Sequence, residues 1–192
     1  MKKKTDTWLM LLYNLPAQPS TQRVYVWRKL KKCGALFWQT SVCLLPSHPG
    51  FREQFERLKQ DIAERHGEAK ISTIQFPEPS EQKAVENRFR QQTDEEYQEF
   101  LGRCRDFHDE LAKEHKASHY TFAELDENEV ELEKLRSWLS KIQGRDFFHA
   151  ALKNKARQAL AACEKDFAKF SNTVAKTNER NLQNTNRKLK GR

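Results

Sequence analysis

The sequence has few of the residues that build disulfide-rich, metal-binding or membrane-spanning proteins. Its 192 residues include only four cysteines, six glycines and two methionines. No Cys-x-x-Cys pair occurs, so neither a zinc site nor a disulfide framework is expected, and the thiols should be reduced. No apolar run reaches the roughly 18 residues that a membrane span requires. The first apolar segment ends without a small-residue cleavage site, so we expect a cytoplasmic protein that has no membrane partner.

Catalytic signatures are also missing. The chain has neither Gly-x-Ser-x-Gly nor a glycine-rich phosphate loop. We therefore expect that the protein is not an enzyme and uses no cofactor or metal. A metal-dependent enzyme stays open as an alternative, because His115 and His119 have a spacing that can chelate a transition metal. The acidic stretch from Glu124 to Glu129 lacks the spacing of an EF-hand loop, and a helix N-terminus would account for its carboxylates.

The charges that are present divide the chain into three regions. Residues 1–80 carry a net charge of +6, residues 81–150 of −6 and residues 151–192 of +8. A basic front, an acidic middle and a basic tail predict a polyanion-facing surface at one or both ends.

Residues 1–78 are predicted to form a ferredoxin-like βαββαβ domain of the α+β class. Strands are expected over residues 8–15, 35–45 (two short strands or one bent one) and 69–76. A first helix starts near Ser20, ends at Gly34, and is expected to carry Val24, Trp27 and Leu30 on its buried face. A second helix has an apolar stripe from Phe51 to Ile62. The order of these elements matches the split βαβ arrangement, in which two helices cover one face of an antiparallel sheet.

The rest of the chain is predicted to be helical and then disordered. The Pro77–Ser80 segment breaks the strand pattern, and residues 79–175 are expected to form a small helical bundle. Its first member is a short helix over 81–92, and the capping box Thr93–Glu96 is expected to open a second, long helix. From residue 176 to residue 192 the chain is basic and has no apolar periodicity, which predicts a disordered tail.

Basic residues on the first helix are the best candidates for a binding site. Several cations on one surface can neutralise several phosphates, which supplies affinity rather than sequence readout. The predicted nucleic-acid-binding residues are Arg23, Arg28, Lys29, Lys31 and Lys32, with Lys2–Lys4 nearby. The alternative is an ordinary solvated helix face. The tail, with Arg187, Lys188, Lys190 and Arg192, is a second candidate.

Two stretches of this sequence resemble the N-terminal domain of the ChrB family. The first comprises Trp8–Pro16, Arg23–Leu30, Gly34-Ala35 and Val42–Pro46, and the second comprises Tyr120–Glu129, Leu132–Leu135, Trp138-Leu139 and Arg145–Phe148. The resemblance implies a bacterial cytoplasmic protein of chromate resistance that regulates transcription of a chromate-efflux operon, with DNA as partner and chromate as an effector to be tested. Full-length members have a further C-terminal domain, so we expect a stand-alone homologue to which that domain's sensing does not transfer.

The first half of the chain also has a weaker resemblance to another family. The first half is similar to small nuclease-like subunits of CRISPR adaptation, in which an aspartate ends the first strand. Asn14 stands at that place here, which argues against nuclease chemistry. Ferredoxin-like sheets often dimerise, so a homodimer is expected. A protein–protein adaptor that docks through the acidic middle and binds no DNA is the main alternative function.

Overall fold

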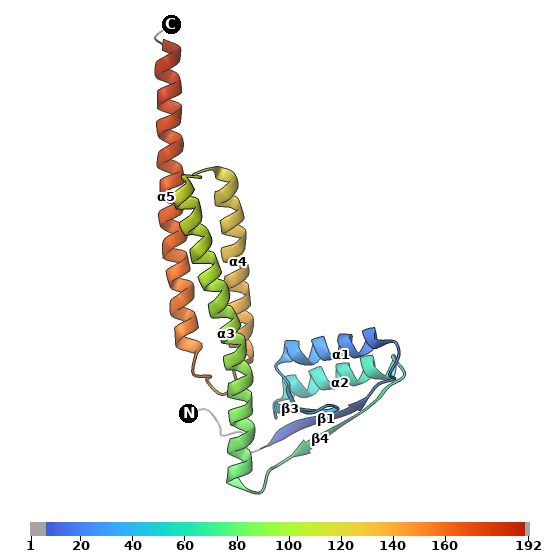
Figure 1. The fold of residues 1–192 in the computed structure, drawn as a ribbon. Helices are drawn as coiled ribbons and strands as arrows, with labels where there is room; N and C mark the ends of the chain where they lie inside the picture. Colours follow the sequence, from blue (N-terminus) through green and yellow to red (C-terminus); the bar gives the residue numbers. More distant parts are fainter. Residues whose placement is uncertain (1–6, 191–192) are drawn as a thin grey trace. The chain divides into compact units, whose positions relative to one another are not determined.

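The computed structural model describes residues 7–190, and the side chains of residues 7–184. These residues form an α+β structure, as predicted, with one four-stranded antiparallel sheet and five helices (Figure 1). The chain divides into two compact units. The first comprises the residues up to Gln92 and the segment Arg145–His149, and the second comprises Thr93–Gly144 and the residues from Ala150 onward.

The first unit is built on the sheet. Its elements are β1 (Trp8–Asn14), α1 (Ser20–Cys33), β2 (Leu36–Gln39), β3 (Val42–Pro46), α2 (Pro49–Ala63) and β4 (Glu68–Ile74). The strand order is β2-β3-β1-β4, so β1 and β3 are central. Leu11 of β1 pairs with Cys43 of β3 on one side and with Ile71 of β4 on the other. Helices α1 and α2 lie side by side along the sheet (Figure 1).

Strand β1 is apolar at almost every position because both faces of the sheet are covered. Successive side chains of a strand point to opposite faces. Leu9 and Leu11 pack into a cluster with residues of α1 and α2. Trp8 belongs to a second cluster with residues of α3 (Pro79–Ala117), and its ring stacks on Phe89 with 5.4 Å between centroids. The Trp8 Nε1 donates a hydrogen bond of 2.7 Å to Gln82 Oε1. The sequence predicted only the helices of the first face.

A short segment from later in the chain completes this unit. The ring of Phe148 lies 5.6 Å from that of Trp8, and its carbonyl oxygen accepts a hydrogen bond of 3.0 Å from Arg90 Nε. Phe147 contacts both apolar clusters. Gly34 ends α1 with a φ of 76°, as predicted, and a Cβ there would lie 2.7 Å from the Cβ of Arg145. The packing of the 145–149 segment therefore leaves no room for a side chain at position 34.

The second unit consists of three long helices: the part of α3 from Thr93, α4 (Phe122–Arg145) as far as Gly144, and α5 (Lys153–Lys190). Their shared core includes Tyr97, Phe100, Cys104, Leu132, Leu139, Ile142, Cys163 and Val174. Figure 1 shows the three helices running alongside one another. None of the helices within residues 7–190 combines the length and apolar character needed to cross a membrane.

The predicted helix start at Thr93–Glu96 is wrong. Helix α3 runs without a break from Pro79 to Ala117. No proline follows Pro79 in this range, so the chain has no residue that would stop a helix before the predicted cap. The Asp94 carboxylate instead accepts hydrogen bonds from the N–H groups of Leu152, at 2.8 Å, and Ala151, at 3.2 Å. Asp94 thus satisfies two amides just ahead of α5.

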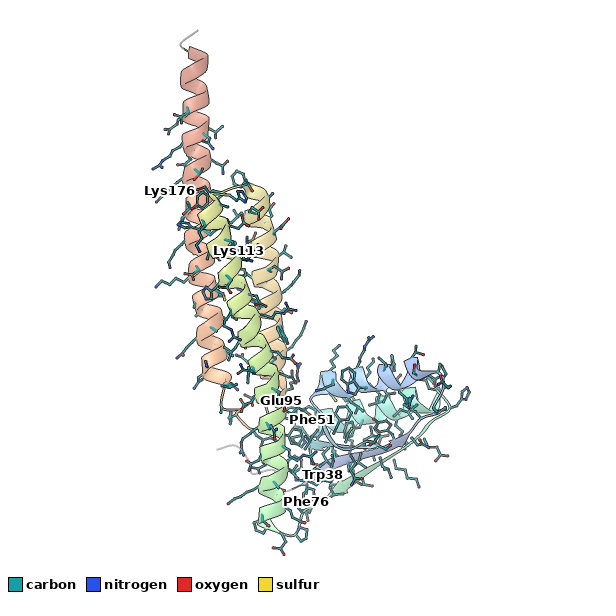
Figure 2. The ribbon with its side chains drawn as sticks, in the orientation of Figure 1. Trp38, Phe51, Phe76, Glu95, Lys113 and Lys176 are labelled. Atoms are coloured by element: carbon teal, nitrogen blue, oxygen red, sulfur yellow. The ribbon has the colours of Figure 1, made fainter. Side chains whose placement is uncertain are left out.

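Helix α5 continues past its last core residue, Val174. It extends to Lys190, beyond the ends of α3 and α4 (Figure 1), and Figure 2 labels Lys176 at the beginning of this extension. The predicted domain limits (1–78, 79–175 and 176–192) and the disorder of the last region stay predictions. Lys2–Lys4 and Arg192 lie outside the described residues, as do the side chains of Arg187, Lys188 and Lys190.

Candidate nucleic-acid interface

Helix α1 has two apolar stripes that share Leu30. The structure buries the stripe with Val26, whereas the sequence predicted that the stripe with Val24 and Trp27 would be buried. Val26 and Leu30 are fully buried against the sheet. Val24 and Trp27, predicted to face the core, are 42% and 48% exposed. Both stripes contain Leu30 and both have helical spacing, so periodicity alone does not separate them. The expectation for Val24 and Trp27 is therefore wrong, and α1 presents two apolar side chains to solvent.

The five predicted cations lie on this helix without carboxylate partners. Four of them are exposed and Lys31 is half-buried; the set is Arg23, Arg28, Lys29, Lys31 and Lys32. Helix α1 contains no Asp or Glu. Within the part of the chain that the structure describes, none of the five forms an ion pair, whereas Arg57 of α2 pairs with Glu53 at 2.6 Å and Arg90 of α3 with Glu86 at 3.3 Å. Among the residues that the structure describes, no carboxylate therefore lies within ion-pair distance of these cations.

The structure places two of these cations on one side of the helix and the other three on different sides. With about 100° between successive residues of a helix, Arg28 and Lys32 lie on the side that faces away from Leu30, whereas Lys31 lies on one flank and Lys29 on the other. Arg23 lies closest to the direction of Leu30, in the first turn of the helix, where it is exposed. The predicted set therefore wraps around the exposed surface of α1 rather than forming a single row.

The flank with Lys29 includes a cation that sequence reasoning missed. Lys29 Nζ lies 5.3 Å from the centroid of the Tyr25 ring, and Arg65 Cζ lies 3.9 Å from the same centroid. The Tyr25 hydroxyl donates to Asp61 Oδ2 at 3.2 Å. The spacing of residues in the sequence did not place Arg65 beside α1, because Arg65 and Tyr25 meet only when α1 and α2 pack together.

The side of α1 that carries Arg23 and Trp27 borders a recess of about 470 Å³, which we call the Trp27 recess. Its lining comes from the end of β1, from α1 and from the β2–β3 turn: Tyr13, Asn14, Leu15, Arg23, Val24, Trp27, Phe37, Thr40 and Ser41. No acidic residue lines it. Burial, with a smaller contribution from nearby Cys43, raises the pKa of Tyr13 to about 12, so its hydroxyl stays protonated at neutral pH. That hydroxyl donates to the Thr40 carbonyl at 3.5 Å.

Helix electrostatics accounts for some of the basic residues but not for all. Lys31 and Lys32 occupy the last turn of α1, where the helix dipole favours cations. Arg23 is the fourth residue of α1, close to the end where the dipole disfavours a positive charge. The stability of the helix therefore does not explain Arg23.

The predicted histidine pair is not arranged as a chelate. Helix α3 ends at Ala117, so His119 lies beyond it. The His115 Nδ1 lies 2.6 Å from the Tyr120 hydroxyl, whereas the His119 Nδ1 lies 3.2 Å from Glu114 Oε2. Among the described residues no group of three or more potential metal ligands is found.

The acidic stretch has structural partners, and burial keeps two of the four thiols neutral. Glu124 lies in the first turn of α4, as the helix-N-terminus interpretation predicted, and its N–H donates to Thr121 Oγ1. Farther along α4, Glu131 pairs with Lys134 at 2.5 Å. Burial raises the pKa of Cys33 to about 11 and that of Cys43 to about 12, so both thiols are neutral at physiological pH.

Comparison with known proteins gives two matches. A family model described as "Protein ChrB, N-terminal" matches residues 23–181. The protein named "Protein ChrB" of Cupriavidus metallidurans is 31% identical over 94 residues, which cover 49% of this chain and 28% of that protein. The chain thus aligns with less than a third of this relative's length.

Proposed function

Since the chain belongs to the ChrB N-terminal family, we propose that it is a cytoplasmic, DNA-binding regulatory protein of the chromate-resistance type that controls transcription of a chromate-efflux operon. The observation that carries the DNA-binding part is the surface of α1. Five cations lie on a helix that contains no acidic residue, and none of them has an ion-pair partner among the described residues. A surface of this kind fits a polyanion better than it fits a neutral or basic partner.

The arrangement of the cations suggests how they would act. Arg28 and Lys32 face outward together and would contact phosphates along one strand of the backbone. Lys29 and Lys31, on the two flanks, and Arg23, in the first turn, would contact phosphates to either side. Each neutralised phosphate releases condensed counterions, so binding would weaken as salt rises. Such contacts position a protein on DNA and do not read its sequence.

Three finer features belong to the same proposal. We regard the first unit as a ferredoxin-like module, which is supported by the element order and by the sheet order β2-β3-β1-β4. Homodimerisation is supported only by the general tendency of such sheets to pair. Chromate as an effector is supported only by the family relation.

A protein–protein adaptor is the second candidate, and one observation favours it. Phe122 and Val130 of the acidic helix α4 are 59% and 54% exposed. Exposed apolar side chains among carboxylates are suited to a basic, amphipathic partner. This candidate predicts no salt-sensitive affinity for DNA.

Charge reversal on α1 tests the proposal. The double variant Arg28→Glu, Lys32→Glu should lower the affinity for duplex DNA at least tenfold at low salt, because two phosphate contacts become repulsive. The control is Lys155→Glu, Lys165→Glu on α5, which makes the same change of charge at two exposed lysines of the second unit. Affinity would be measured by fluorescence anisotropy, and circular dichroism would confirm that both variants fold. Equal affinities of the α1 variant and the wild type would exclude α1 as the DNA-binding surface.

A further inference from the structure

The exposure of Trp27 is not explained by the packing of the first unit. An indole is one of the largest apolar side chains, and nearly half of this one, 48%, is open to solvent. Next to it, Val24 is 42% exposed. Apolar side chains gathered at the edge of a recess and surrounded by polar groups are typical of a contact surface.

The surroundings of Trp27 are suited to an anionic ligand. Arg23 lines the same recess. Arg28 is the next residue after Trp27, and Lys31 lies one helical turn after Trp27. The nine lining residues include no Asp or Glu. A positively charged groove with an aromatic side chain is the arrangement by which proteins hold single-stranded nucleic acid, since the backbone follows the cations and a base stacks on the ring.

Several of the lining residues that lie outside α1 are polar. Thr40 and Ser41 form the β2–β3 turn, and Asn14 ends β1. The Ser41 and Asn14 side chains form no hydrogen bond within the part of the chain that the structure describes. The Tyr13 hydroxyl is protonated at neutral pH. These groups can donate to and accept from the edge of a planar heterocycle, while the face of that heterocycle lies on the indole.

We infer that the Trp27 recess binds an unpaired nucleobase of a DNA strand whose phosphates lie on Arg23, Arg28 and Lys31. The inference rests on the proposed function and deepens it. In a duplex, both faces of each base are covered by its neighbours, so only an unpaired base can stack on Trp27. The protein therefore favours single-stranded or locally opened DNA over a fully paired duplex of the same length and charge.

The test compares three DNA ligands with two variants of Trp27. The ligands are a fluorescently labelled 12-nucleotide oligothymidylate, an abasic strand with the same number of phosphates, and a 12-base-pair duplex. Trp27→Ala should weaken binding of oligothymidylate about tenfold or more, because stacking of one base on an aromatic side chain has this order of effect. It should change the affinity for the abasic strand and for the duplex less than twofold. Trp27→Phe should keep most of the affinity for oligothymidylate.

The outcomes separate this inference from the proposed function. A selective loss of oligothymidylate binding in Trp27→Ala, with Trp27→Phe close to wild type, supports the recess. If Trp27→Ala leaves all three affinities unchanged, or lowers them equally, the recess does not bind a base, and duplex binding through the cations of α1 still stands. If Arg28→Glu, Lys32→Glu also leaves every affinity unchanged, or wild type binds no DNA, both claims fail. Circular dichroism of each variant would confirm that the fold is retained.

Discussion

At the scale of single residues, three partly or fully buried groups of the first unit resist ionisation. Burial raises the pKa of Tyr13 to about 12, that of Cys33 to about 11 and that of Cys43 to about 12, from ordinary values of 10.0 for the phenol and 9.0 for the thiols. Each group is neutral when protonated and would have to become an anion inside an apolar cluster. Folding therefore depends on keeping these protons.

These raised pKa values predict how the stability of the fold changes with pH. A group whose pKa is higher in the folded state contributes stability in full below its unfolded pKa, and loses it as the pH rises through the folded value. For these groups the loss runs from about pH 9 to about pH 12. We expect the urea midpoint of unfolding to fall between pH 8 and pH 10.5. In Cys43→Ala the fall should be smaller, although this variant is less stable at pH 8. An identical pH dependence in the two proteins would show that the Cys43 thiol does not contribute.

Residue types could be assigned from the sequence more easily than residue environments. The five cations of α1 and the stop at Gly34 were predicted correctly as features of one helix. Trp27 was assigned to the wrong face, because an apolar residue at helical spacing is buried more often than not and the competing stripe through Val26 shares Leu30. Arg65 and Tyr13 were missed, since their places beside α1 depend on contacts between elements that are distant in sequence.

At the scale of elements, the α+β class follows the prediction, whereas the start of α3 does not. Capping residues indicate where a helix can begin, but Thr93–Glu96 lies inside a continuous helix that started at Pro79. The packing of α3 against the second face of the sheet was also not predicted. Because the pattern assigns residues 79–92 to a bundle, it does not predict their packing against Trp8 through Val85 and Phe89.

Gly34 joins two elements, so its substitution tests how the 145–149 segment is held. Gly34→Ala places a side chain at a φ of 76° and 2.7 Å from the Cβ of Arg145. The left-handed backbone alone costs about 1–2 kcal/mol for a residue with a Cβ. We expect the free energy of unfolding, from urea denaturation, to fall by at least this amount.

A second glycine provides the control for this prediction. Gly144 lies in α4, and a Cβ added there would have no neighbouring atom within 4 Å, so Gly144→Ala meets open space. Alanine favours a helix more than glycine does, so the stability of this variant should stay the same or rise by up to about 1 kcal/mol. Equal effects of the two substitutions would contradict the close packing at Gly34.

At the scale of the whole molecule, the two units differ in how many of their exposed cations form ion pairs. In the second unit many exposed cations are neutralised locally, as Arg136 is by Glu164 at 2.7 Å and Lys169 is by Asp166 at 2.8 Å. On α1 of the first unit such pairs are absent among the described residues. The regional charges of the sequence pointed to both ends of the chain, and only the structure separated paired from unpaired cations. The affinity for DNA should therefore reside in the first unit.

The central claim is a salt-sensitive, specific interaction with DNA, and one titration tests it most directly. Binding to the DNA upstream of the protein's own gene would be measured against an unrelated fragment over a range of salt concentrations, with and without chromate. Five phosphate contacts predict a slope of about −4.5 in a plot of log affinity against log salt. The account predicts a steep slope of this order, tighter binding of the upstream fragment, and release by chromate. Absence of binding to both fragments would contradict it and would favour the adaptor.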